Sequence, residues 1–394
     1  MTDASMTFDT VIVGGGPAGL TAAIALADAG VRTALLARRA PYADNRTTAL
    51  LGASVDLLER LDVWQRCRGG AAPLKVMRLV DDTGRLIRAP EVRFVSEEIG
   101  LEQFGFNIDN RTLVAALEAR AAELPGLTRL DDEATTVTPG DDAVAIVTRH
   151  GNAIAARLVV GSDGRQSSCR DAAGIELRRR DLGQSAVTFN ISHSRPHRNI
   201  STEFHTPHGP CVFVPLPGDR CSIVWVVAPG EAERLMSLSD EELSAAIEKQ
   251  SQSILGRTTV EPGRYTFPLA IEQPSQIAKN RIALVGESAH VVPPIGAQGL
   301  NMGLRDAADL AGIVGEALSL GEDPGGPQVL HRYAAARRSD IATRTFVIDM
   351  ANRSLLSDLL PVQTARAAGL HLIRAIAPLR RLAMREGLAP SWRI

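Results

Sequence analysis

A glycine-rich turn near residue 14 is the first segment whose spacing could do chemistry. Gly14, Gly16 and Gly19 follow the pattern G-x-G-x-x-G, with Pro17 and Ala18 inside it. In this pattern the first glycine allows a tight turn, the second lets the backbone approach a pyrophosphate, and the third lets a helix pack on a strand. The free N–H groups of the helix N-terminus then face the phosphates. The spacing predicts a dinucleotide site.

Three elements must position this turn. Residues 10–13 are a short β-branched run typical of a buried parallel strand, residues 20–29 have a helical composition, and residues 31–37 predict a second strand. The frame is therefore a βαβ unit, although a glycine-rich turn of another α/β fold has the same local pattern. The acidic residue that usually closes the second strand and binds ribose is missing. Ala37 and Arg38 stand there, so backbone groups must hold the ribose, or it is bound more weakly.

Two later segments put carboxylates directly after apolar runs. The segment Gly161-Ser162-Asp163-Gly164 follows residues 158–160, and Gly286 and Glu287 follow residues 281–285. A carboxylate at the carboxyl end of a parallel strand can accept hydrogen bonds from the hydroxyls of a bound ligand. Asp-Gly is also a common turn pair, so Asp163 has a purely structural alternative. The run 293–301 comes next, and we expect a long helix from about Met302.

With these three motifs in order, the sequence resembles the FAD-dependent aromatic hydroxylases, the group that includes para-hydroxybenzoate hydroxylase. Within that group it is most similar to the ubiquinone-biosynthesis hydroxylases (UbiH/UbiF/Coq6). Three segments carry the closer resemblance: PPIGAQGLN at 293–301, RTTAL at 46–50 and PLRRLAM at 378–384. The resemblance covers nearly the whole chain.

The resemblance implies non-covalent FAD. It implies a cofactor site made of Gly14, Gly16, Pro17, Ala18, Gly19, Ala37, Arg38, Arg46, Arg111, Asp163, Gly286, Glu287, Pro294, Gly296, Gln298, Gly299, Leu300 and Asn301. The family has Asp where Glu287 stands, one methylene shorter. The sequence identifies no catalytic side chain and predicts no metal site.

The implied reaction is hydroxylation of the aromatic ring of a polyprenylated phenol through a C4a-hydroperoxyflavin, with O₂ as co-substrate. Only one dinucleotide fingerprint is present, so electrons come from transiently bound NAD(P)H or from a partner reductase. Three alternatives remain open. One is a flavin reductase or halogenase, although the halogenase W-x-W-x-I-P pattern is absent around Trp225. The others are a catalytically silent flavin- or lipid-binding subunit of a quinone-biosynthesis complex, favoured by Ala37 and Glu287, and a hydroxylase of a small soluble phenol.

The expected fold class is α/β, with a Rossmann-like FAD-binding domain, an α+β substrate domain built on an antiparallel sheet, and C-terminal helices. We assign residues 1–75, 105–176 and 277–330 to a discontinuous FAD-binding domain. Residues 76–104 and 177–276 form the substrate domain, with β-strands at 185–191, 201–205, 211–216 and 221–227, and residues 201–227 face the substrate. Residues 331–394 form the helical region, after a loop at 321–327.

Composition and charge limit the classes of molecule that this protein is expected to bind. A net charge of −2 argues against nucleic acid binding, and the four cysteines show no C-x-x-C spacing. No uncharged apolar run reaches the ~20 residues of a membrane helix, so we expect a cytoplasmic protein that could lie peripherally at the inner face of the membrane.

The C-terminal region from residue 353 has seven arginines, two acids and many leucines. It suits an anionic membrane surface or another ubiquinone-biosynthesis protein; alternatively, these helices only cover the core, and Pro361 and Pro378 should interrupt them. Because the flavin motifs end near residue 305, we expect nothing after about residue 350 to be needed for FAD.

Overall fold

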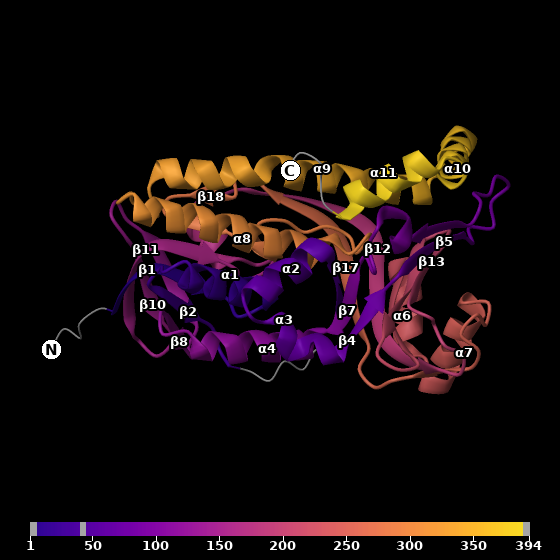
Figure 1. Cartoon of the computed structure of the whole chain (residues 1–394), viewed down its shortest axis with the longest axis horizontal. Helices are drawn as coiled ribbons and strands as arrows, with labels where there is room; N and C mark the ends of the chain where they lie inside the picture. The colour runs from indigo at the N-terminus through magenta and orange to yellow at the C-terminus, as the bar shows by residue number, and fades with distance from the viewer. Residues whose placement is uncertain (1–5, 40–44, 389–394) are drawn as a thin grey trace.

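Figure 1 shows the computed structural model, which describes residues 6–39 and 45–388. Its first sheet has eight strands, in the order β18-β19-β11-β1-β2-β8, with β10 and β9 continuing beside β11. The strands are β1 (Met6–Val13), β2 (Thr33–Leu36), β8 (Leu127–Leu130), β9 (Ala134–Pro139), β10 (Val144–Thr148), β11 (Ala153–Gly161), β18 (Ala278–Lys279) and β19 (Ile282–Leu284).

The central strands of this sheet are parallel, so their carboxyl ends meet at one edge. Val13 of β1 lies opposite both Leu36 of β2 and Gly161 of β11, and Gly161 lies opposite Leu284 of β19. The glycine turn, the Asp163 turn and the Glu287 turn therefore begin side by side, although some 270 residues separate the first from the last. This is the edge at which open α/β sheets bind ligands.

Helices cover one face of this sheet. The covering helices are α1 (Pro17–Asp28), α4 (Asn110–Glu123), α8 (Gln298–Ser319) and α9 (Pro327–Leu356). In Figure 1, α8 lies above α1 and α4 lies below it, and the other face of the sheet packs against β10 and the segment of Cys169 and Ala173. α1 packs against both α8 and α4. Fully buried side chains such as Leu20, Ile24 and Leu304 make this core, and their burial supplies its hydrophobic stabilisation.

Two helix starts differ from the expectation. α1 begins at Pro17 rather than at Leu20, because proline fits the first helical position, where no N–H is needed. α8 begins at Gln298 rather than near Met302. Ala297 has a left-handed conformation with φ of 55°, and Asn301 Nδ2 donates to the Ala297 carbonyl at 2.5 Å, which closes the first turn early.

The second sheet has the order β16-β12-β15-β14-β13-β5-β6, with β17 also paired to β12. Its strands are β5 (Val76–Asp81), β6 (Val92–Val95), β12 (Leu177–His193), β13 (Ile200–Thr206), β14 (Gly209–Leu216), β15 (Arg220–Val227), β16 (Thr258–Val260) and β17 (Tyr265–Pro274). Two helices, α6 (Pro229–Ser237) and α7 (Asp240–Gln250), pack near it at the lower right of Figure 1.

All four strands expected between residues 185 and 227 are present and longer than expected, and they pair antiparallel. The sheet is not purely antiparallel, however, because β13 pairs with β5 in parallel. Cys211 lies opposite Trp225 and Cys221 opposite Pro215, so the register keeps these two thiols apart. The assignment of segments to two domains stays a prediction.

A small third sheet, β3-β7-β4, lies between the two larger ones (Figure 1). Its strands are β3 (Thr47–Leu51), β4 (Ala71–Leu74) and β7 (Gly105–Asp109), and the short helices α2 (Gly52–Arg60) and α3 (Trp64–Cys67) lie between β3 and β4 in the chain. A further short helix, α5 (Ser168–Ala172), follows β11 of the first sheet. Asn107 of β7 donates to the Pro215 carbonyl of β14 at 2.9 Å, which ties this sheet to the second one.

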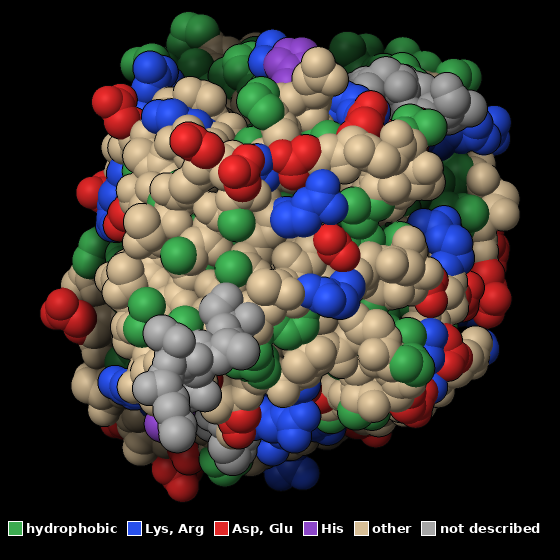
Figure 2. Space-filling model, turned by 90° about the vertical axis from the view of Figure 1, so that its left-hand side faces the viewer, with side chains coloured by type: hydrophobic (Ala, Val, Ile, Leu, Met, Phe, Trp, Pro, Cys, Tyr) green, Lys and Arg blue, Asp and Glu red, His purple; other side chains and the backbone are tan. Residues whose placement is uncertain are grey.

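The C-terminal region is helical, as expected: α9 is followed by α10 (Leu360–Ala375) and α11 (Ala377–Leu388) along the upper edge of Figure 1. Pro361 and Pro378 lie in the first turns of α10 and α11, where proline is favoured, so they start these helices rather than interrupt them. Among the described residues, no helix combines the length and apolar character that crossing a membrane requires. On the face shown in Figure 2, acidic and basic side chains are interspersed.

Candidate functional site

The glycine turn is shaped by two close backbone contacts. A Cβ on Gly14, whose φ is +113°, would lie 2.2 Å from the Ser162 carbonyl oxygen, and a Cβ on Gly19 would lie 2.1 Å from the Gly14 carbonyl oxygen. Gly16 differs, because a Cβ there would have no atom within 4 Å. Gly16 is the N-cap of α1, and no side chain caps that end. The first N–H groups of α1 therefore face open space, as a pyrophosphate site requires.

The end of β2 is contacted by an arginine of the neighbouring strand that sequence reasoning missed, and this side chain is only 7% exposed. Arg129 of β8 donates to the Ala37 carbonyl and pairs with Glu118 at 3.1 Å. A Cβ on Gly15 would lie 2.8 Å from Ala37 Cβ, so small residues on both sides let the turn approach β2. The Arg38 side chain is 65% exposed and lies 3.6 Å from the Glu133 carboxylate. Ala37 thus contributes backbone and close packing, and Arg38 points outward.

Asp163 lies at the predicted edge, and both of its carboxylate oxygens are hydrogen-bonded within the chain. It accepts from Ser167 Oγ at 2.5 Å, from Ser168 Oγ at 3.0 Å and from the Cys169 amide at 3.1 Å. These bonds hold the turn that leads into α5. The structural alternative for Asp163 is therefore present in the molecule, and a ligand there would share its lone pairs.

Glu287 is in a different position. Its side chain is 60% exposed and lies 3.7 Å from Arg165 Nε, so it can still accept hydrogen bonds from hydroxyl groups. The preceding Gly286 has φ of +69°, and a Cβ there would lie 3.1 Å from Ala18 Cβ. The Glu287 turn and the glycine turn of α1 are thus in direct contact.

The segment 293–301 brings the remaining motif residues to the same edge. Gly296 and Gly299 have open space where a Cβ would lie, and Gln298 is only 6% exposed. Gln298 Oε1 is buried and has no hydrogen-bond partner within the described part of the chain. Pro294 and Leu300 are half-buried in the same segment. Open space beside two glycines and an unpaired buried acceptor together fit a flat polar ring such as a flavin.

Asn301 acts inside the protein through both atoms of its amide. Its Oδ1 accepts from the Leu51 amide at 2.9 Å and its Nδ2 donates to the Ala49 carbonyl at 2.8 Å, which fixes the start of α8 against β3. Arg46 and Arg111 lie close to each other. The Asn110 amide donates to the Arg46 carbonyl, and Arg111 donates to Asn45 Oδ1 at 2.6 Å. The structure thus gathers both arginines near one end of β3.

A buried ionic cluster supports the Glu287 turn, and no local sequence pattern revealed it. Asp306 of α8 is fully buried and accepts from the Gly286 amide at 3.0 Å, from His290 Nε2 at 2.6 Å and from Arg337 Nε of α9 at 2.6 Å. Burial would raise the pKa of Asp306, but the neighbouring His290 and Arg337 hold it well below its usual range. Asp306 is therefore a carboxylate that fixes the turn.

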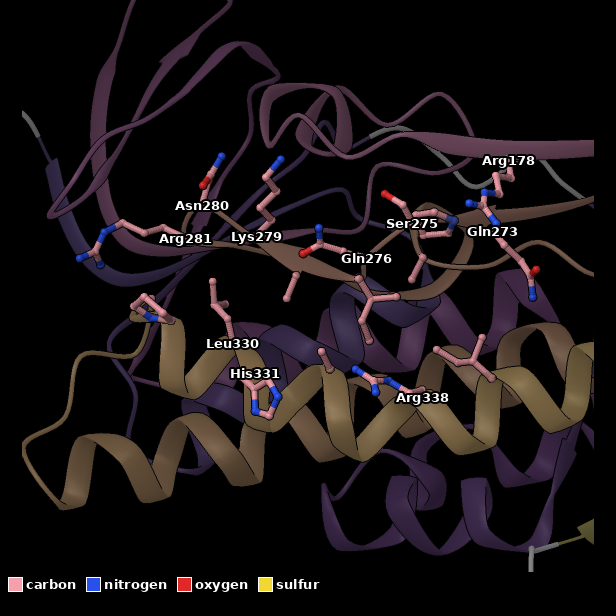
Figure 3. A pocket seen from close by; sticks show the side chains of 18 of the residues that line it. Arg178, Gln273, Ser275, Gln276, Lys279, Asn280, Arg281, Leu330, His331 and Arg338 are labelled. Carbon is pink, nitrogen blue, oxygen red and sulfur yellow. The ribbon is translucent and has the colours of Figure 1, made fainter.

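A shallow groove of about 830 Å³ lies elsewhere, between α9 and the segment that joins β17 to β19 (Figure 3). Its lining includes Arg178, Lys279, His331 and Arg338. Lys279 donates to the Gly174 carbonyl at 2.9 Å, so part of this positive charge is used within the chain. None of the predicted FAD-site residues is among the described residues that line the groove.

Comparisons with known proteins identify the cofactor class. The FAD binding domain family matches residues 7–346. Ubiquinone hydroxylase UbiL of Rhodospirillum rubrum is 34% identical over 387 residues, covering 96% of this chain and 89% of that protein. The 3-demethoxyubiquinol 3-hydroxylase of Escherichia coli is 29% identical over 394 residues, with 96% and 98% covered.

A comparison with solved structures concerns the fold. The crystal structure of p-nitrophenol 4-monooxygenase PnpA from Pseudomonas putida DLL-E4 aligns with a TM-score of 0.79 at 19% identity, covering 98% of this chain and 99% of that one. At this identity the likeness shows the fold alone, and it confirms the expected α/β fold class.

Proposed function

Because this chain belongs to the FAD-binding-domain family of flavoprotein monooxygenases, we propose that it hydroxylates the aromatic ring of a polyprenylated phenol in ubiquinone biosynthesis. The observation that carries the proposal is the similarity to ubiquinone hydroxylase UbiL, which extends over 96% of this chain. The fold and the cofactor motifs alone would suit many aromatic hydroxylases; this end-to-end similarity favours the quinone precursor.

At the cofactor site, each motif has a separate task. The first N–H groups of α1 beside Gly16 would bind the pyrophosphate, and the Glu287 carboxylate would accept hydrogen bonds from ribitol hydroxyls. The backbone at Gly296 and Gly299 would hold the flavin ring, and the positive end of α8 would favour negative charge on it. Bound FAD supplies the oxygen-transfer chemistry, and the protein orients the ring and excludes water.

The electron donor and the oxidant complete the proposal. O₂ is the co-substrate, and electrons come either from NAD(P)H that binds transiently or from a partner reductase. Anaerobic mixing of the purified protein with NADH or NADPH separates the two: bleaching of the yellow flavin absorbance identifies a direct donor, and its absence identifies a reductase partner.

A polyprenylated phenol resides in the membrane, so the enzyme must meet it there or on a carrier protein. Nine of the fourteen large hydrophobic side chains exposed in the described chain lie in α9, α10, α11 or the connections between them: Phe346, Val347, Met350, Leu359, Leu360, Leu372, Ile376, Leu379 and Leu382. Three exposed arginines, Arg374, Arg381 and Arg385, lie among them in α10 and α11. Apolar and basic side chains together suit an anionic membrane surface.

The experiment that tests the substrate class compares two phenols that differ only in their tail. The purified FAD-loaded protein is given a polyprenylated phenol in vesicles, or the same ring without its prenyl chain in solution, with an electron donor and O₂. We expect a hydroxylated product from the prenylated phenol. Faster turnover of the small phenol would replace this proposal with a hydroxylase of soluble phenols.

A further inference from the structure

The C-terminal helix α11 contacts the segment that forms the proposed flavin-ring site. Gln298, the first residue of α8, donates from Nε2 to the Gly296 carbonyl at 3.0 Å and towards the Gly387 carbonyl at 3.4 Å. Gly387 is in the last turn of α11. The carbonyls of a last helical turn have no partner within the helix, so they need donors from elsewhere.

A second donor reaches the same carbonyl from α9. Arg344 is only 8% exposed, and its Nη1 donates to the Gly387 carbonyl at 3.1 Å. A cation at a helix C-terminus also interacts favourably with the negative end of the helix dipole. The Gly387 carbonyl oxygen of α11 therefore accepts hydrogen bonds from two other helices. One donor is Gln298 of α8, beside the ring segment, and the other is Arg344 of α9.

Arg344 is also joined to the ionic cluster under the Glu287 turn. Its Nε lies 3.6 Å from the Asp340 carboxylate, and Asp340 in turn pairs with Arg305 at 2.8 Å and with Arg337 at 2.9 Å. Arg337 bonds to Asp306, which accepts from the Gly286 amide. A series of buried charged side chains thus connects Arg344, which contacts α11, to the turn that carries Glu287.

We propose that Arg344 and the Gly387 carbonyl form a latch that positions Gln298 and the ring segment for the flavin, so that α11 belongs to the cofactor site. The proposal rests on the proposed function, because it assumes FAD at this edge. It also reverses the expectation that nothing after residue 350 matters for FAD. Arg344 acts here as a positioning residue, through Gly387 and Gln298.

The test uses the full-length chain with Arg344→Met, Arg344→Lys and a matched control, Arg353→Met. Arg353 is on the same helix, is 62% exposed and pairs with Asp349 at 3.0 Å. The measurements are the FAD dissociation constant, the visible spectrum of the bound flavin and the melting temperature of the apoprotein. We expect Arg344→Met to weaken FAD binding about tenfold and to shift the visible bands, because the ring segment is displaced.

Arg344→Lys retains one donor that reaches Gly387, so it should lie nearer to the wild type in both properties, and Arg353→Met should match the wild type. A lower apoprotein melting temperature with unchanged FAD affinity and spectrum in Arg344→Met would overturn the latch and leave a merely structural arginine. Failure of the wild type itself to bind FAD would instead overturn the proposed function on which the latch depends.

A double substitution tests the route through Gly387. Gln298→Leu removes the other donor to that carbonyl. If both donors act through α11, the double variant Arg344→Met/Gln298→Leu should lose less FAD affinity than two independent effects predict. Its fold-loss should be smaller than the product of the fold-losses of the two single variants. Fully multiplicative losses would show that the two side chains act independently, which contradicts the latch.

Discussion

Gly14 and Gly16 belong to the same turn, yet the structure predicts opposite consequences for their substitution. Gly14 has φ of +113°, and an added Cβ would lie 2.2 Å from the Ser162 carbonyl oxygen. A strained residue in this region costs about 1–3 kcal/mol, and the overlap with backbone adds to that. Gly14→Ala should therefore lower the unfolding free energy of the apoprotein by at least that amount.

Gly16 has φ of −73°, a conformation open to any residue, and open space beyond it. Gly16→Val should leave the unfolding free energy of the apoprotein within about 1 kcal/mol of the wild type. The valine side chain would instead occupy the space of the pyrophosphate. Hydrogen bonds to a charged group contribute about 1.5–3 kcal/mol each, so loss of two lowers FAD affinity at least about a hundredfold.

The assay for both variants combines chemical denaturation of the apoprotein with FAD titration followed by flavin fluorescence. The reasoning is refuted if Gly16→Val binds FAD as tightly as the wild type, since the open space beside Gly16 would then serve no phosphate. It is equally refuted if Gly16→Val unfolds as readily as Gly14→Ala, because the lost affinity would then reflect a damaged fold.

Three further predictions concern charge. Glu287→Gln should weaken FAD binding about tenfold in an equilibrium titration, because the acceptor of the hydrogen bonds from ribitol loses its charge. Glu287→Asp should bind FAD at least as well as the wild type. Unchanged affinity in the glutamine variant would show that this residue does not contact the cofactor. Replacing Arg374, Arg381 and Arg385 by Gln should reduce sedimentation with anionic vesicles at low salt, because each arginine contributes about 1 kcal/mol to the binding free energy. The FAD content should stay the same. Equal binding of the wild type at low and high salt would argue against this surface as a membrane contact. Burial raises the pKa of Asp349, but hydrogen bonds from two arginines bring it below its ordinary 3.8, so its contribution to stability is present above that pH and is lost as the pH falls further. Asp349→Asn should flatten the pH dependence of the unfolding free energy in that acidic range, and an unchanged slope would contradict the assignment.

The parts of the fold that sequence analysis predicted are those specified by neighbouring residues. The glycine spacing, the apolar run before it and the helix after it predict one βαβ unit, and the structure contains β1, α1 and β2 there. The segment 293–301, which ends at Asn301, likewise predicts the start of a helix. The helix begins four residues before the expected Met302, because Ala297 adopts a left-handed conformation. Such a conformation at a non-glycine residue is rare and has no sequence signal.

The residues that sequence analysis missed act through contacts between distant segments. Asp306 stands in an ordinary helical pattern, and its role depends on Arg337 being placed beside it by the packing of α9 on α8. Arg129 reaches Ala37 only because β8 lies next to β2 in the sheet. The parallel pairing of β13 with β5 has the same origin, since it joins segments more than a hundred residues apart.

Arginines of the C-terminal region show why a count of charges overestimates the membrane surface. Arg366 pairs with Asp81 at 2.7 Å and is buried, and Arg380 pairs with Glu98 at 2.7 Å. Both arginines attach α10 and α11 to the elements at residues 76–104. The sequence shows seven basic residues here, but the partners of these two lie nearly 300 residues earlier in the chain.

The measurement that tests the central claim most directly is the origin of the oxygen atom in the product. The purified FAD-loaded protein, with its electron donor and a polyprenylated phenol in vesicles, is allowed to react under ¹⁸O₂, and the product is analysed by mass spectrometry. A flavin-dependent hydroxylase inserts one ¹⁸O atom per product molecule. Unlabelled product, or consumption of O₂ that yields only hydrogen peroxide, would contradict the account.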